Sequence, residues 1–137
     1  MAADHRALLT ASRLGVLATL ERSGLSQLSP VQPYYDDAAG TLQVSMTEDR
    51  AKTRILRRDP RAAVEVISPD GPSWATAEGA VMLVGPGADP HGPEVEALAE
   101  YYRAAAGEHP DWDDYRATTV ADRRVLMTAE RTYGDSV

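Results

Sequence analysis

The sequence predicts a mainly β protein, a closed antiparallel barrel of about six strands with a few short helices. Short apolar or alternating runs recur along the chain, and residues typical of turns separate them, as in Glu21-Arg22-Ser23-Gly24 and Pro69-Asp70-Gly71-Pro72. Segments with helical spacing are few and short. The chain has 137 residues, which predicts one domain over residues 1–137.

The first half of the chain predicts one helix and three strands. Asp4 can cap a helix over residues 4–12, and the apolar run 14–20 is typical of a buried strand. Residues 25–35 alternate in polarity and contain two prolines, which favour an edge strand or a bulge. Residues 36–40 then form a hairpin loop, and 41–46 a returning strand.

The second half predicts three helices and three strands. Thr47 is a candidate N-cap for a helix at about 48–58, which Asp59-Pro60 ends because the residue before proline avoids helical geometry. The irregular segment 85–93 lacks the third glycine and the acidic residue of a dinucleotide-binding fingerprint. The remaining elements are expected as strands at 61–68, 74–84 and 123–132 and helices at 94–106 and 111–120.

Composition narrows the class of protein. The net charge of −7 argues against general affinity for nucleic acid or an anionic membrane, and the absence of cysteine excludes thiol and disulfide chemistry. The sequence has no signal-peptide pattern and no apolar run of membrane-spanning length, so we expect a cytoplasmic protein. A deep cofactor cavity would take much of so small a core, which favours an oligomer with a shared site.

The basic residues are unevenly distributed. Six of the 14 lie within twelve positions: Arg50, Lys52, Arg54, Arg57, Arg58 and Arg61. They follow Ser45 and Thr47, at a strand end where a helix begins, and a helix N-terminus favours phosphate or carboxylate. Lys52 is the only lysine and falls among the apolar positions of the helix, which suggests an anion ligand. The alternative is a solvated arginine-rich helix whose dipole Glu48 and Asp49 already satisfy.

Other polar clusters are better explained by local structure. Asp36-Asp37 precedes a glycine turn, and His109-Pro110-Asp111 is typical of a helix start, so we predict no metal site. No nucleophile motif is present. The aromatic residues Tyr34, Tyr35 and Trp74 either stack on a bound ring or pack in a core or interface.

Several motifs occur in an order that resembles a known superfamily. They are Gly15-Val16-Leu17-Ala18-Thr19-Leu20, Gly24-x-x-Gln27-x-Ser29-Pro30-Val31, Ser45-x(6)-Lys52-Thr53-Arg54, Leu56-Arg57-Arg58-Asp59-Pro60-Arg61 and Glu78-Gly79. Together they look like the pyridoxamine 5′-phosphate oxidase-like split barrels, FMN-binding in many members. Residues 107–116 and 122–126 are similar to its F420-dependent reductase branch of mycobacterial and actinobacterial type (FDOR-B). One departure is Ile55, where the family often has asparagine.

The resemblance implies a homodimeric split β-barrel with cofactor sites at the subunit interface. It implies that Ser45, Met46, Thr47, Arg50, Ala51, Lys52 and Thr53 surround the cofactor phosphate, with Lys52 and Arg50 as its cationic partners. The isoalloxazine-like ring would lie against Ser29, Pro30, Val31 and Gln32, and Trp74 would line the site from its own or the partner subunit.

Three functions agree with this resemblance. The first is an F420-dependent oxidoreductase that transfers a hydride between the reduced deazaflavin and a small conjugated substrate. The second is an FMN-dependent flavoprotein of the oxidase type. The third is a non-catalytic carrier of F420. No complete arginine and histidine set for the substrate phosphate of a true pyridoxamine 5′-phosphate oxidase is found, which argues against vitamin B6 oxidation.

Overall fold

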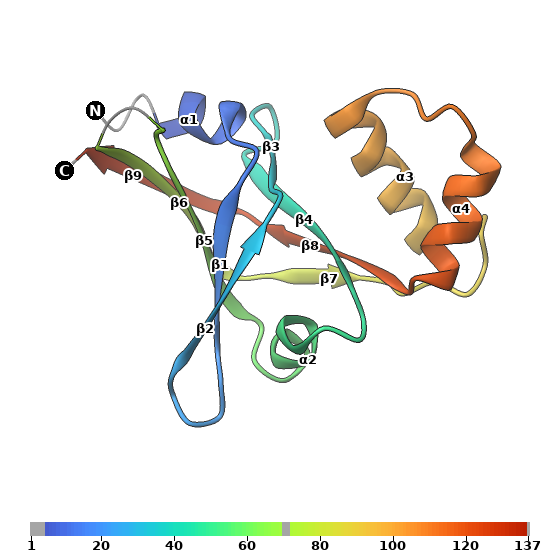
Figure 1. Ribbon diagram of the computed structural model, residues 1–137, viewed down its shortest axis with the longest axis horizontal. Coiled ribbons are helices and arrows are strands. Elements are labelled where there is room, and N and C mark those ends of the chain that lie inside the picture. The colour runs from blue at the N-terminus through green and yellow to red at the C-terminus, as the bar shows by residue number, and fades with distance from the viewer. Residues whose placement is uncertain (1–4, 70–71, 137) are drawn as a thin grey trace.

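A computed structural model describes residues 5–69 and 72–136, which form nine strands and four helices (Figure 1). The strands make two antiparallel sheets, a large sheet in the order β2-β1-β5-β6-β9 and a small sheet in the order β3-β4-β8-β7. The strands are β1 Gly15–Leu20, β2 Ser26–Val31, β3 Tyr34–Asp36, β4 Thr41–Thr47, β5 Arg61–Ile67, β6 Ser73–Ala80, β7 Met82–Val84, β8 Arg124–Ala129 and β9 Arg131–Ser136.

The predicted six strands correspond to six continuous runs, three of which bend from one sheet into the other. β2 passes into β3 through Gln32-Pro33, β6 into β7 through Val81, and β8 into β9 through Glu130. Proline lacks the N–H that a sheet ladder needs, which accounts for the break at Pro33. The prediction of a mainly β antiparallel fold is confirmed, and the count differs because each bend divides one run into two.

The four helices lie at three places around the sheets (Figure 1). Helix α1 (His5–Ala11) contacts β3, β5, β6 and β9, and α2 (Ala51–Arg58) contacts β1. Helices α3 (Pro93–Ala106) and α4 (Trp112–Ala121) pack against each other and against β8. No helix among the described residues is long and apolar enough to pass through a membrane.

The main core lies between the inner faces of the two sheets. Leu17, Val64 and Ala77 contribute from the large sheet, and Val44 and Met127 from the small one. All five have relative exposures of at most 2%. Leu9 of α1 and Leu56 of α2 complete the same cluster. The apolar period of two in β1 and β4 therefore matches the face that each strand buries.

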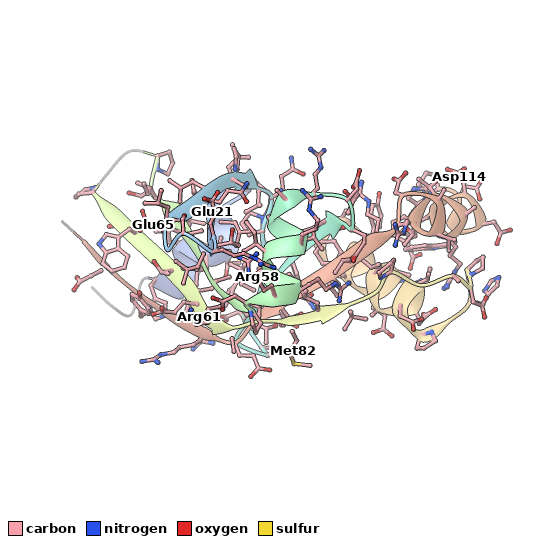
Figure 2. The ribbon with its side chains drawn as sticks, turned by 90° about the horizontal axis from the view of Figure 1, so that it is seen from below. Glu21, Arg58, Arg61, Glu65, Met82 and Asp114 are labelled. Carbon is pink, nitrogen blue, oxygen red and sulfur yellow. The ribbon has the colours of Figure 1, made fainter. Side chains whose placement is uncertain are left out.

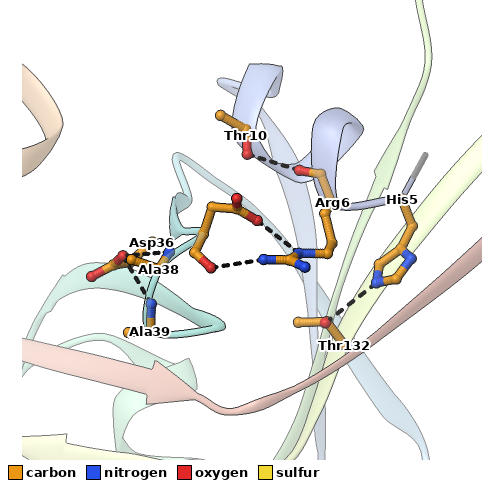
Figure 3. A network of polar contacts seen from close by, with 8 residues as sticks. His5, Arg6, Thr10, Asp36, Ala38, Ala39 and Thr132 are labelled. Atoms are coloured by element: carbon orange, nitrogen blue, oxygen red, sulfur yellow. Dashed lines mark hydrogen bonds and ion pairs between the residues drawn. The ribbon is translucent and has the colours of Figure 1, made fainter. Parts of the chain in front are cut away.

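Polar contacts attach α1 to two neighbouring segments (Figure 3). The Arg6 guanidinium pairs with Asp37 at 2.8 Å, and His5 Nε2 lies 3.5 Å from the Thr132 hydroxyl of β9. Asp36 Oδ1 accepts hydrogen bonds from the backbone N–H groups of Ala38 and Ala39. The pair Asp36-Asp37 therefore has the structural role in a turn that its sequence context predicts.

The outer face of the large sheet exposes several apolar side chains beside the charged residues Arg61 and Glu65 of β5. Val16, Leu28 and Ile67 are 44%, 66% and 64% exposed. Leu28 lies opposite Ala18, whose other neighbour is Ala63. Farther along this face, Trp74 meets Tyr133 edge to face at 5.8 Å between ring centroids. Exposed apolar side chains grouped on one sheet face are typical of an interaction surface.

Candidate functional site: a basic pocket beside an aromatic chamber

A cavity of about 520 Å³ opens where the end of β4 meets the start of α2, and we term it the basic pocket. Eight of the residues proposed from sequence line it: Ser29, Pro30, Ser45, Met46, Thr47, Arg50, Ala51 and Lys52. Three further residues, Gln27, Leu28 and Arg124, complete the lining. The fold thus brings the hydroxyls of the β4 end, part of β2 and three cations together.

The start of α2 differs from the sequence-based expectation. Thr47 is the last residue of β4 and does not cap the helix, because its hydroxyl donates to Asp49 Oδ1 at 2.6 Å. Residue 50 occupies the N-cap position without a side-chain cap hydrogen bond, and α2 begins at Ala51. The Thr53 hydroxyl donates to the Thr47 carbonyl at 2.7 Å, which fixes the helix to the strand end.

The basic residues of segment 50–61 divide into two groups. Four contact protein acceptors: Arg57 pairs with Glu48, Arg61 pairs with Asp59, Arg54 donates to the Asp49 carbonyl and Arg58 to the Leu20 carbonyl. Figure 2 shows Arg58 and Arg61 well away from Asp114 of α4. Among the described residues, Arg50 and Lys52 have no ion-pair partner, and both line the basic pocket.

Lys52 is half-buried, and its environment is unfavourable for a positive charge. Burial lowers the pKa of its ammonium group from the ordinary lysine value, and the neighbouring Arg50 lowers it further. Asp49 interacts electrostatically with Arg50, but no carboxylate forms an ion pair with Arg50 or Lys52 among the described residues. The solvated-helix interpretation therefore describes the other four basic residues of the segment, whereas Arg50 and Lys52 remain candidates for anion binding.

Three lining residues were missed by sequence reasoning, and two of them, Gln27 and Arg124, are polar. The side-chain Oε1 of Gln27 is buried and has no hydrogen-bond partner, which is costly unless a ligand supplies a donor. The sequence signal that could have identified Gln27 is its position two residues before Ser29, on the same face of β2. Arg124 lies on β8, and only the β4–β8 pairing brings it opposite Thr47. Nothing in the local sequence could place it there.

Four proposed site residues lie elsewhere. Val31 is 7% exposed in the main core, and Thr53 is fully buried at the start of α2. Gln32 follows the end of β2 and lines the neighbouring cavity. Trp74 lies on the outer face of the large sheet, beside a shallow hollow that Glu65 and Ile67 also line. None of the four lines the basic pocket.

A second cavity, of about 550 Å³, adjoins the basic pocket, and we term it the aromatic chamber. Its wall contains the rings of Tyr34, Tyr101, Tyr102, His109 and Tyr115, together with Gln32 and Arg13. Ser45 and Arg124 line both cavities. Burial raises the pKa of the Tyr101 and Tyr115 phenols, so both hydroxyls stay protonated at neutral pH.

The His109 segment contributes to this wall rather than to a metal site. Asp111 caps α4 by accepting from the Asp114 N–H at 3.1 Å, which is the helix-start role that the sequence predicts. His109 packs on Tyr102 at 5.2 Å between ring centroids. Within residues 5–69 and 72–136, no group of three or more His, Cys, Asp or Glu side chains is arranged to hold a metal ion.

The two antiparallel sheets and the basic pocket at a strand end define a mainly β protein with a candidate anion-binding site. A family model described as pyridoxamine 5′-phosphate oxidase matches residues 1–130. The chain therefore belongs to this family, as the ordered sequence motifs indicated.

Solved structures agree with this assignment. A structure described as an F420 reductase is 26% identical, covers 93% of this chain and 94% of its own, and superposes with a TM-score of 0.63. The conserved hypothetical protein Rv2991 from Mycobacterium tuberculosis is 23% identical, with coverages of 98% and 83% and a TM-score of 0.70. An FAD-binding protein from Mesorhizobium loti is 19% identical, with coverages of 98% and 93% and a TM-score of 0.60. The last two support the fold.

The structure also explains the departure at Ile55. This side chain is 8% exposed on the buried side of α2 and does not line the basic pocket. An apolar residue is what this packing position requires.

Proposed function

We propose that this protein is an F420-dependent reductase whose basic pocket holds the cofactor phosphate. The observation that carries the proposal is the pair Arg50 and Lys52, which lack an ion-pair partner among the described residues and line one cavity with the hydroxyl of Ser45. The helix start beside them has no side-chain cap. Cations, hydroxyls and free backbone N–H groups are the donors that bind phosphate.

The residues present fit such a cofactor. Lys52 and Arg50 would bind the phosphate, with charge-assisted hydrogen bonds of about 1.5–3 kcal/mol each. The buried Gln27 Oε1 would accept from an N–H of the ring edge, which would satisfy its missing hydrogen bond. Ser29 and Pro30 of β2 would form one wall of the ring site. When bound, the reduced deazaflavin supplies a hydride, and the barrel orients the acceptor and keeps water away.

The choice of F420 rests on two observations outside the pocket. The sequence motifs at 107–116 and 122–126 are similar to the F420-dependent branch. A structure described as an F420 reductase matches nearly the whole chain at 26% identity. FMN is the alternative cofactor, which the family model supports, and the same pocket suits either phosphate. A carrier that binds F420 without turnover is the third candidate.

We further propose a homodimer formed through the outer face of the large sheet. This face exposes Val16, Ile67 and Tyr133, and Leu28 belongs both to it and to the basic pocket. A second copy packed here would cover the apolar side chains and close one side of the pocket. Trp74 lies on the same face, where it could reach the partner subunit's pocket.

The test is a titration of colourless purified protein with F420 and with FMN, followed by ligand fluorescence. Micromolar or tighter binding of F420 with much weaker binding of FMN is the expected result. The reverse order would assign the protein to the FMN-dependent members. Oxidation of reduced F420 in the presence of a conjugated acceptor would then separate the reductase from the carrier, since a carrier gives no turnover.

A further inference from the structure

Ring contacts and hydrogen bonds within α3, α4 and the segment between them fix the aromatic side chains of the chamber wall. Tyr102 packs against Tyr115 at 5.0 Å and against Trp112 at 5.9 Å between ring centroids. The indole N–H of Trp112 donates to Glu108 at 2.8 Å, and the Arg103 guanidinium lies 4.5 Å from the centroid of the same indole. The Tyr115 hydroxyl donates to the Leu98 carbonyl of α3 at 2.8 Å. These contacts fix the orientation of the rings before any ligand binds.

A second aromatic pair lines the chamber. Tyr34 of β3 meets Tyr101 of α3 edge to face at 6.3 Å between ring centroids. A guest in the chamber would meet ring edges and faces, which favour flat conjugated molecules. The volume of about 550 Å³ lies within the range of small-molecule sites, about 300–1,000 Å³.

The chamber contains two arginines and two aspartates, and one of the arginines is available to an anionic guest. Arg124 is partly neutralised by Asp122 at 3.8 Å, whereas Arg13 has no ion-pair partner within residues 5–69 and 72–136. An arginine lining an aromatic cavity binds a carboxylate in a two-point geometry. Asp114 also lines the chamber, but it forms no ion pair with Arg13 among the described residues.

We propose that the aromatic chamber is a binding site for a planar aromatic carboxylate, with its rings between the tyrosines and its carboxylate on Arg13. The role of this compound as hydride acceptor rests on the proposed reductase function, but its binding does not. Ser45 and Arg124 line both cavities, so a guest in the chamber would lie next to whatever occupies the basic pocket.

Calorimetric titration of the cofactor-free protein with naphthalene-2-carboxylate tests the site, with naphthalene-2-carboxamide as the neutral probe of the same shape. Ala104 and Ala105 of α3 provide a matched pair of variants, because both are exposed and only Ala105 lines the chamber. We expect the carboxylate to bind more tightly than the amide. Ala105→Phe should abolish its binding, and Ala104→Phe should preserve it. Arg13→Gln should weaken the binding of the carboxylate by about tenfold or more and leave the binding of the amide unchanged.

Parallel titration with F420 separates this proposal from the proposed function. Retained F420 binding in Ala105→Phe supports a separate acceptor site, and loss of F420 binding there would overturn it by assigning the chamber to the cofactor. Equal binding of the two naphthalene probes, or unchanged carboxylate binding in Ala105→Phe, would also overturn it. A wild-type protein that binds the carboxylate but not F420 would contradict the reductase function and leave the chamber supported.

Discussion

The guanidinium of Arg124 donates to the hydroxyl of Ser45 at 3.4 Å, across the pairing of β8 with β4. Both side chains line the basic pocket and the aromatic chamber, so this contact lies at the junction of the two cavities. A cation at that position attracts an anion from either side.

The position of Arg124 predicts a double effect of its removal. Arg124→Gln should weaken the binding of F420 and of naphthalene-2-carboxylate, because the change removes positive charge from both cavities. Arg123→Gln is the matched control, since Arg123 is exposed and lines neither cavity. Calorimetry on both variants checks this prediction. Weaker binding of only one ligand in Arg124→Gln would show that the charge of Arg124 does not act on both cavities.

The lowered pKa of Lys52 predicts a pH-dependent affinity. A bound phosphate favours the charged ammonium and raises its pKa, so binding takes up a proton once the free Lys52 has begun to titrate. The affinity for F420 should therefore fall as the pH rises, starting below the ordinary lysine pKa of about 10.4. Lys52→Arg should bind with a flat profile over the same range, because arginine stays charged. Fluorescence titrations from about pH 8 to about pH 10 measure both profiles. If the affinity of both proteins fell equally with rising pH, Lys52 would not be the titrating group.

The proposed dimer predicts a specific sensitivity to charge on the outer sheet face. Ile67→Arg should give the monomer mass in sedimentation velocity, because it would bury an unpaired cation in the interface. Leu25→Arg is the control, since Leu25 is equally exposed but lies in the turn between β1 and β2. A wild-type protein that sediments as a monomer would refute the dimer directly.

The core position of Leu9 predicts a large cost of truncation. Leu9→Ala should lower the free energy of unfolding by about 2–5 kcal/mol, because it leaves a cavity where α1 closes the barrel. Leu14→Ala should change it by no more than about 0.5 kcal/mol, since Leu14 is 69% exposed. Urea denaturation followed by circular dichroism compares the two. Similar decreases in the free energy of unfolding in both variants would mean that Leu9 of α1 contributes no more to the core than the exposed Leu14.

Much of the fold could be predicted because alternation and turn residues are local signals. The faces of segment 25–35, with Gln27, Ser29 and Val31 on the inner side, follow from a period of two. The bend at Val81 could not be predicted, because an apolar residue inside an apolar run carries no turn signal. Only the competition between the two sheets for hydrogen-bond partners divides β6 from β7 there.

The candidate site was partly predictable for the same reason. Ser45, Thr47, Arg50 and Lys52 lie within eight positions, so one strand-to-helix connection brings them together. Arg124 and the tyrosines of α3 and α4 reach the site only through long-range pairing with β4 and packing on β8. Their contribution depends on tertiary structure, which a local pattern does not contain.

The central claim is that Lys52 forms the anion site of the basic pocket, and one comparison tests it most directly. F420 affinity is measured by fluorescence for the wild type, for Lys52→Ala and for Arg58→Ala, whose side chain bonds to the Leu20 carbonyl outside the pocket. Lys52→Ala should weaken binding by about tenfold or more, and Arg58→Ala should leave it unchanged. Equal affinities in all three proteins would contradict the assignment of the cofactor phosphate to this pocket.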